Sequence, residues 1–262
     1  KIRDLSKGTN PHQKSDGFYN INDSNSPYKV LNGNPSYINM LDASYSWGLM
    51  CDLKKLSPNQ LAFASYKHNS PAGIAFYEKL DESSNLKFMV DKNYSFGDTA
   101  STYLRSRNCD PLSSFGDFIA TNAIVDIETA QLIKKDVSDG IIAQGYTEDA
   151  LNILKHKKNG NYVILEGEKI HYENEMREIG GIALHQEKDN FLTFVNKPVT
   201  KHKLNNDIIE SIKLVNTTLK YTQSNSVAIC YDGQVIGIGA GQQNRVECVK
   251  IAGKKMENWI LR

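Results

Sequence analysis

A lysine and a histidine stand side by side at Lys67 and His68, in the stretch KHNSPAG (67–73). Histidine titrates near neutral pH, so it can take up and release protons under ordinary conditions. A lysine ammonium can stabilise a negative charge that develops beside it and can assist a leaving group. The pair is therefore suited to acid–base chemistry at the edge of a sheet, although an ordinary strand-to-helix turn has the same composition.

The elements around this pair have to bring both side chains to one place. The run LAFASY (61–66) is apolar and predicts a buried strand that ends at the pair. Neighbouring residues of a regular strand point to opposite faces, so the chain must bend for both side chains to reach one substrate. We expect Pro71 and Gly73 to produce that bend.

Helices and strands alternate along the rest of the chain, which predicts an α/β fold with part of the sheet parallel. Helices are predicted at 38–56, at 126–136 with Asp126 as the cap, at 147–158 with Thr147 as the cap, and at 205–221. Strands are predicted at 61–66, 140–145 and 161–166. Asp232-Gly233 predicts a two-residue hairpin, followed by a closing helix. The polar stretch 166–181 predicts a boundary between a first subdomain, 1–180, and a second, 181–262.

Composition excludes several classes of function. The 262 residues carry a formal net charge of +1, which does not indicate a nucleic-acid or membrane partner. We expect a cytoplasmic protein, because the sequence has no membrane-spanning run and no signal peptide. The four cysteines are far apart and the six histidines lack metal-binding spacing, so free buried thiols are expected instead of disulfides or zinc.

The glycine run GIGAG (237–241) is the one motif that suggests a dinucleotide site. A dinucleotide fingerprint needs its glycines in a strand-to-helix turn, whereas this run forms the second arm of the predicted hairpin. The glycines can instead allow a backbone or a ligand to approach closely. Since QQNR follows and predicts a helix start with Arg245, we keep this stretch as a candidate binding edge.

Eight motifs taken in order resemble the AICAR transformylase domain of the bifunctional purine-biosynthesis family, in its eukaryote-like branch. They are GTNPHQ (8–13), LNGNPSYINMLDA (31–43), KHNSPAG, SSFGDF (113–118), VSDGIIAQGY (137–146), KKNGNY (157–162), KYTQSNSV (220–227) and GQVIGIGAGQQNR (233–245). The resemblance implies formyl transfer from 10-formyltetrahydrofolate to the 5-amino group of AICAR. It also implies cytidine-deaminase-like α/β subdomains without the zinc, and a homodimer with active sites at its interface. The cyclohydrolase domain of that family is absent from the sequence.

The resemblance assigns roles to individual residues. It implies that His68 is the base for the weakly nucleophilic amine, and that Lys67 stabilises the oxyanion and assists the leaving folate nitrogen, with Asn225 beside them. Other residues would contact the nucleotide: Asn39, Phe115, Gly116 and Asp139 at the ring and ribose, and Lys158 at the phosphate. Arg245 and Val246 would lie towards the folate. Thr222, Ser224 and Ser226 match positions that hold potassium in some relatives.

Two departures from the family pattern change the expectations. Ser6 and Lys7 stand where relatives carry Arg-Tyr, so Lys7 could supply the charge for the phosphate but not the bidentate geometry. Family sequences also continue beyond the position of Arg262. We therefore expect the second subdomain to be incomplete, its hairpin to need cover from outside the chain, and the isolated chain to show little transfer.

Two alternatives remain open on sequence grounds. One is a catalytically inactive nucleotide- or folate-binding relative or fragment. The weaker one is a deaminase-like enzyme, against which the missing H-x-E and C-x-x-C signature argues.

Overall fold

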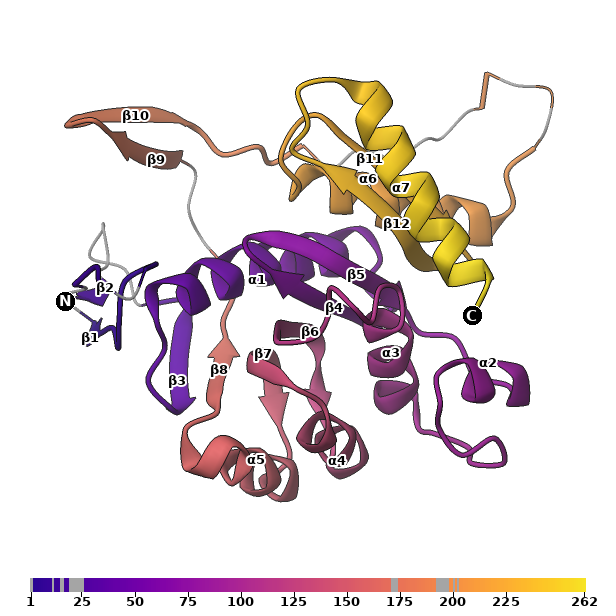
Figure 1. Cartoon of the computed structure of the whole chain (residues 1–262), viewed down its shortest axis with the longest axis horizontal. Coiled ribbons are helices and arrows are strands. Elements are labelled where there is room, and N and C mark those ends of the chain that lie inside the picture. The colour runs from indigo at the N-terminus through magenta and orange to yellow at the C-terminus, as the bar shows by residue number, and fades with distance from the viewer. Residues whose placement is uncertain are drawn as a thin grey trace.

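The computed structural model of the chain describes residues 2–10, 12–14, 17–18, 26–170, 174–191, 198–199, 201 and 203–262. Pro11 of the GTNPHQ motif and residues 171–173 of the predicted boundary lie outside these ranges. The fold is α/β, as the sequence predicts. In the described residues, an eight-stranded mixed sheet has the order β11-β12-β5-β4-β6-β7-β8-β3 (Figure 1).

The strands of this sheet come from the whole length of the chain. Their bounds are β3 (Tyr28–Asn32), β4 (Ala62–Lys67), β5 (Ser70–Phe76), β6 (Asp117–Val125), β7 (Ser138–Tyr146), β8 (Val163–Gly167), β11 (Ser226–Tyr231) and β12 (Gln234–Ala240). β6, β7 and β8 are parallel, and β4 runs antiparallel to β6. The predicted strands at 61–66, 140–145 and 161–166 are thereby confirmed within two residues.

Helices cover the sheet on both faces. They are α1 (Tyr37–Leu56), α2 (Glu82–Lys87), α3 (Asp98–Arg107), α4 (Ile127–Lys135), α5 (Glu148–Lys155), α6 (Asn206–Lys220) and α7 (Arg245–Ile260), with a short 3-10 turn at Lys157–Gly160. The predicted caps are confirmed, since Asp126 accepts from Thr129 and Thr147 accepts from Ala150.

Alternate residues of the strands supply two cores. Ala64, Phe118 and Ile142 pack on one face with α1 and with Leu214 of α6. Ile119 and Ile141 pack on the other face with side chains of α3, α4 and α5. This alternation is the period of two that a sheet buried on both faces requires.

The Asp232-Gly233 hairpin is confirmed, because both residues have positive φ, at 49° and 63°. We expected this hairpin to need cover from outside the chain, and that expectation was wrong for β12. Gln234 pairs with Ala75 of β5, and α7 lies across β11 and β12 (Figure 1). The hairpin therefore extends the main sheet and leaves β11 at its edge.

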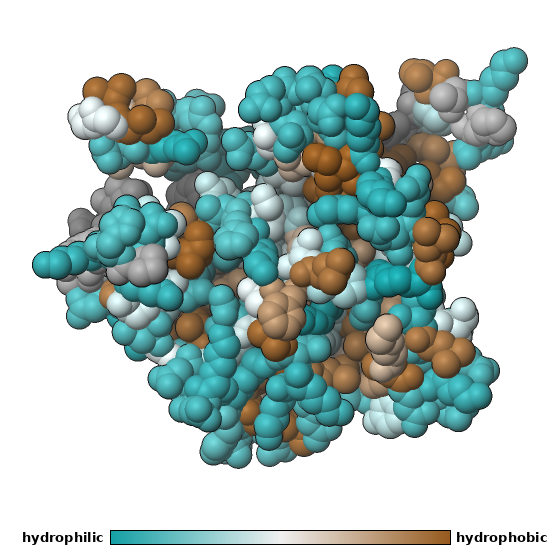
Figure 2. Space-filling model, in the orientation of Figure 1, coloured by the Kyte–Doolittle hydropathy of each residue, from teal (hydrophilic) through white to brown (hydrophobic). Residues whose placement is uncertain are grey.

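Two small hairpins lie outside the main sheet. β1 (Arg3–Asp4) pairs with β2 (Gly17–Phe18), and β9 (Asn174–Ile179) pairs with β10 (Ile182–Glu187). The second lies within and beyond the predicted boundary 166–181, and its apolar side chains are visible at the top left of Figure 2. Large exposed side chains on it are Met176, Ile179, Ile182 and Leu184.

Candidate functional site

Six of the fourteen predicted site residues lie at one end of the strands of the main sheet, which we call the sheet edge. A row of paired residues crosses four strands: Tyr66 with Phe118, Phe118 with Gly140, and Gly140 with Val163. The residues just beyond this row lie at the same edge: Lys67 at the end of β4 and His68 after it, Phe115 and Gly116 before β6, Asp139 in β7, and Lys158 before β8. Figure 1 shows these strands side by side.

The turn between β4 and β5 determines where Lys67 and His68 lie. Lys67 pairs with Ser70, so His68 and Asn69 alone form the loop, with φ of 53° and 62°. Two successive positive φ values are those of a type I′ hairpin turn, which breaks the alternation of a strand. The chain therefore bends at His68 itself, and the expected bend at Pro71 and Gly73 was wrong, because both lie inside β5.

Pro71 and Gly73 have structural reasons for their positions. The pairing of β4 with β5 shifts register between Ser65 and Tyr66, so Pro71, which lacks an N–H, stands beside a bulge. A Cβ on Gly73 would lie 2.3 Å from the carbonyl oxygen of Ser106. Close packing of α3 on β5 therefore requires glycine there.

Lys67 is tied to the loop that precedes β6. Its Nζ donates to the carbonyl oxygen of Phe115. Gly116 has a φ of 75°, and a Cβ placed on it would lie 3.8 Å from the same Nζ. The Phe115 ring is 60% exposed, so it is free to stack on a flat ligand. Lys67, Phe115 and Gly116 are thus neighbours.

A second pair lies further along the same edge. Lys158 Nζ donates to Asp139 Oδ1 at 2.6 Å, and both side chains are about half exposed. Lys158 and Asn159 have φ of 52° and 53°, in the left-handed region that most side chains avoid. Asn32 supports this loop from β3, since its Nδ2 donates to the carbonyl oxygens of Gly160 at 3.0 Å and Tyr162 at 2.8 Å.

Asn39 and Lys7 lie near the start of α1. Asn39 Oδ1 accepts from the backbone N–H of Ser36 at 3.0 Å, and Ser36 Oγ accepts from the N–H of Asn39, which forms a capping box. The side chain of Asn39 therefore fixes the helix start. Lys7 is exposed, and its carbonyl oxygen accepts from the N–H of Tyr37 at 2.9 Å.

A buried ionic network supports the Phe115 loop from below. Arg107 Nη1 donates to Asp117 Oδ1 and to the Ser114 carbonyl oxygen, each at 3.0 Å, and Arg107 Nε lies 3.2 Å from Asp136 Oδ2. Asp117 Oδ2 also accepts from Ser65 Oγ at 2.6 Å. Burial raises the pKa of Asp117 to about 6, while Arg107 and Ser65 oppose the rise. The network fixes both ends of the Phe115 turn.

Asn225, Arg245 and Val246 lie on a different part of the fold. Asn225 donates from N and Nδ2 to the carbonyl oxygen of Gln242, each at 3.2 Å, and its own carbonyl oxygen accepts from Cys248 Sγ. Arg245 and Val246 are exposed at the start of α7, whose cap is Asn244. The antiparallel pairing of β12 with β5 directs this end of β12 towards the edge that holds His68. Among the described residues, no hydrogen bond or ion pair joins Asn225, Arg245 or Val246 to Lys67 or His68.

The glycine run has a structural explanation. A Cβ on Gly237 would lie 2.3 Å from the carbonyl oxygen of Ala252, and one on Gly239 would lie 2.1 Å from that of Cys248. The missing side chains therefore let the backbone of α7 approach β12. The sequence left two explanations open for these glycines, close approach of a backbone or of a ligand. The structure shows close approach of a backbone.

Of the predicted potassium residues, Thr222 and Ser224 lie in the loop before β11, and Ser226 is the first residue of β11. Thr222 Oγ1 donates to the carbonyl oxygen of Leu219 at 2.8 Å, and Ser224 is exposed. These hydroxyl oxygens stay a prediction for potassium, and we derive no step through the ion. Within the described residues, His, Cys, Asp and Glu side chains form no group suited to a metal.

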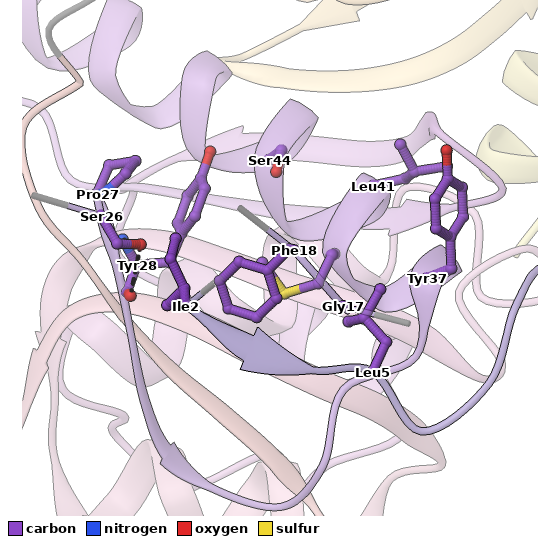
Figure 3. Close-up of a pocket in the computed structure, with 11 residues that line it drawn as sticks. Ile2, Leu5, Gly17, Phe18, Ser26, Pro27, Tyr28, Tyr37, Leu41 and Ser44 are labelled. Carbon is purple, nitrogen blue, oxygen red and sulfur yellow. Dashed lines mark hydrogen bonds between the residues drawn. The ribbon is translucent and has the colours of Figure 1, made fainter. Parts of the chain in front are cut away.

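A pocket of about 270 Å³ lies away from this edge. Tyr37, Met40, Leu41 and Ser44 of α1 form one wall, and Leu5 and other residues of the N-terminal segment form the rest (Figure 3). With 3.6 residues per turn, these positions lie on the face of α1 opposite Asn39 and Asp42. The pocket therefore lies on the other side of α1 from Asn39 and Asp42, although the backbone N–H of Tyr37 in its wall donates to the Lys7 carbonyl oxygen.

Sequence reasoning missed three residues of this edge: Asp42, Arg107 and Asn32. Asp42 is buried, and its Oδ1 accepts from the backbone N–H of Asn69 at 2.6 Å. A signal for it was present, because Asp42 precedes the buried Ser46 and Leu49 by four and seven residues on one helical stripe. Arg107 and Asn32 carried no local signal, since their partners are distant in sequence.

Comparisons with known proteins agree with the resemblance. The family described as AICARFT/IMPCHase bienzyme matches residues 1–255. Two proteins named bifunctional purine biosynthesis protein PurH, from Clostridium botulinum strain 657 (type Ba4) and strain Loch Maree (type A3), are each 34% identical over 260 residues. Each alignment covers 96% of this chain and 46% of the relative, so the chain spans about half the length of these relatives.

No described helix is both long and apolar enough to cross a membrane. The match over 255 of 262 residues determines the family. The chain belongs to the AICARFT/IMPCHase bienzyme family.

Proposed function

We propose that this chain carries the AICAR side of a folate-dependent formyltransferase of purine biosynthesis. The reaction moves the formyl group of 10-formyltetrahydrofolate to the 5-amino group of AICAR and yields formyl-AICAR. The observation that carries the proposal is the sheet edge itself, where Lys67 and His68 lie beside the Phe115–Gly116 turn and in line with the Lys158–Asp139 pair.

In this mechanism the 5-amino nitrogen of AICAR attacks the formyl carbon, and the carbonyl electron pair moves to the oxygen. His68 takes a proton from the amine, and Lys67 stabilises the oxyanion with its ammonium group. The bond between the formyl carbon and N10 of the folate then breaks, and N10 leaves with a proton that Lys67 assists in delivering.

Both reactive side chains are available for these steps. Lys67 is bonded to the backbone oxygen of Phe115 but to no carboxylate within 4.0 Å among the described residues. His68 is exposed at the tip of its turn.

The nucleotide roles follow the order of residues along the edge. The exposed Phe115 ring would stack on the imidazole, with Gly116 and Asn39 close to the ring and Asp139 at the ribose. Lys158 would meet the phosphate, with Lys7 as a second cation. The left-handed loop at Lys158 and Asn159 supports this assignment, because strained backbone concentrates at ligand sites.

The remaining assignments belong to the same proposal. Asn225 would lie beside the transferring group, and Arg245 and Val246 would contact the folate. Thr222, Ser224 and Ser226 stay a prediction for potassium. We further propose a cytoplasmic homodimer of cytidine-deaminase-like subdomains, 1–180 and 181–262.

The test is a formyl-transfer assay with AICAR and 10-formyltetrahydrofolate, run on the longest natural polypeptide that contains this chain and on the chain alone. Lys67→Ala and His68→Ala should each lower kcat at least about 100-fold while calorimetry still detects AICAR binding. Lys135→Ala, at an exposed position of α4, is the matched control and should leave kcat unchanged. Binding of AICAR without any transfer by the longest polypeptide would favour an inactive binding relative instead.

A further inference from the structure

Asp42 is a buried carboxylate directly behind the turn that holds His68. It lies in α1 and is 6% exposed. Its Oδ1 accepts the backbone N–H of Asn69 at 2.6 Å. In a two-residue turn the N–H of the second loop residue has no partner within the turn, so Asp42 satisfies a donor that would otherwise be buried without one.

The carboxylate faces few groups that could balance its charge. No Lys or Arg nitrogen lies within 4.0 Å of it among the described residues. The titratable groups that interact with it are His68 in the turn, Asp139 at the start of β7, and Tyr66 of β4. Of these, His68 alone can become a cation.

Holding the turn does not by itself require a charge. Asparagine has the same shape as aspartate and an oxygen that accepts the same N–H. An ionised carboxylate at this depth is costly to bury, and burial raises the pKa of Asp42 to about 6, while the Asn69 N–H and His68 oppose the rise. A charge retained at such a cost points to a use for the charge.

We propose that Asp42 is a positioning residue for His68. It holds the left-handed turn through Asn69, and its negative charge stabilises the imidazolium that forms when His68 takes the proton of the attacking amine. The proton passes from the amine nitrogen to the imidazole and stays there, so Asp42 remains ionised throughout. This inference rests on the proposed function for the identity of the amine.

Two buried polar atoms beside the turn support a site arranged for a ligand. The Oδ1 of Asn69 and the hydroxyl of Tyr66 are buried and lack hydrogen-bond partners among the described residues. Buried polar atoms are normally paired, so unpaired ones at this edge indicate groups that a substrate completes.

Asp42→Asn in the longest natural polypeptide is the test, because it keeps the acceptor oxygen and removes the charge. We expect kcat to fall about 100-fold while KM for AICAR changes less than about threefold. The low-pH limb of kcat/KM should move to lower pH, because the imidazole loses a nearby negative charge. Asp207 is an exposed aspartate in the first turn of α6, so Asp207→Asn removes the same charge at a distant position. It should change neither kcat nor the low-pH limb of kcat/KM.

A second measurement keeps the inference testable without turnover. Histidine-ring NMR on the wild type and Asp42→Asn gives the pH at which the His68 ring is half protonated, and we expect a lower value in the variant. If the wild type fails to transfer formyl groups, the proposed function falls while this comparison still tests Asp42. An unchanged midpoint, or a wild-type kcat in Asp42→Asn, overturns the role of the charge.

Discussion

The contact between α7 and β12 gives a sharp prediction for the glycine run. A Cβ on Gly239 would lie 2.1 Å from the carbonyl oxygen of Cys248, whereas ordinary contacts begin at 3.4 Å. The obstacle is helix backbone, which cannot rotate away as a side chain could. For Gly239→Ala, α7 must therefore retreat by about 1 Å along the surface where Cys248 and Ala252 are buried, and overpacking of this kind costs about 1–3 kcal/mol or more.

Gly253→Ala is the matched control in the same helix. A Cβ at Gly253 meets nothing within 4 Å, and alanine is favoured over glycine in a helix interior by about 0.5–1 kcal/mol. Urea unfolding of the two variants should therefore show opposite changes in the free energy of unfolding. A Gly239→Ala variant as stable as the wild type would refute the close packing of α7 on β12.

Calorimetry on the wild type should detect no specific NAD binding. Tight NAD binding that is lost in Arg245→Ala would instead support a dinucleotide site at the glycine run.

Three further predictions follow from the site. Arg107→Met should lower the free energy of unfolding by about 3–5 kcal/mol in urea, because it leaves the buried Asp117 carboxylate without its cation; a loss below about 1 kcal/mol would contradict the network. Lys158→Ala should raise KM for AICAR more than it lowers kcat in steady-state assays, since it removes a binding charge remote from the reacting amine; the reverse pattern would refute a phosphate role. Asp42→Asn should be more stable than the wild type at pH 7 by up to about 3 kcal/mol, the cost of raising a carboxyl pKa from 3.8 to about 6. The sign follows from proton binding: between these pH values the folded wild type holds more protons than the unfolded chain, so its stability falls as pH rises through this range. The gain should therefore fade below pH 3.8 in thermal unfolding scans, and a gain independent of pH would contradict it.

Elements whose signals are local were predictable from the sequence. Asp126 and Thr147 each precede a periodic apolar segment and cap α4 and α5. Asp232-Gly233 forms its hairpin because both residues tolerate positive φ. These features depend on a few neighbouring residues, so composition and spacing are enough to find them.

Features that depend on distant pairing were not predictable in the same way. The bend at Lys67 and His68 was assigned to Pro71 and Gly73, because those residues are the usual turn formers. In the structure the register of β4 on β5 places His68 and Asn69 in the loop instead. The pairing of Gln234 with Ala75 is likewise separated by more than 150 residues, and no local pattern indicates it.

The sequence identified residues of the candidate site but not the residues that hold them in position. Lys67, Phe115, Asp139 and Lys158 were identified from motifs and lie at one edge. Asp42 lies in an amphipathic helix. An acidic residue among the buried positions of such a helix looks like a break in the apolar pattern and does not indicate a site. Supporting residues act through atoms that belong to other segments, so their importance becomes visible only when the segments are brought together.

Unfavourable features concentrate at this edge of the sheet. Of the six non-glycine residues with positive φ in the described chain, four lie here: His68, Asn69, Lys158 and Asn159. The carboxylates whose pKa is raised to about 6, Asp42 and Asp117, are buried immediately behind them. The positive φ values at His68 and Asn69 form the turn between β4 and β5, whereas the left-handed backbone at Lys158 and Asn159 and the two buried carboxylates cost free energy. Their common location supports the proposal that this edge is a site of chemistry. Substitutions here that relieve strain or buried charge should stabilise the fold and weaken catalysis together.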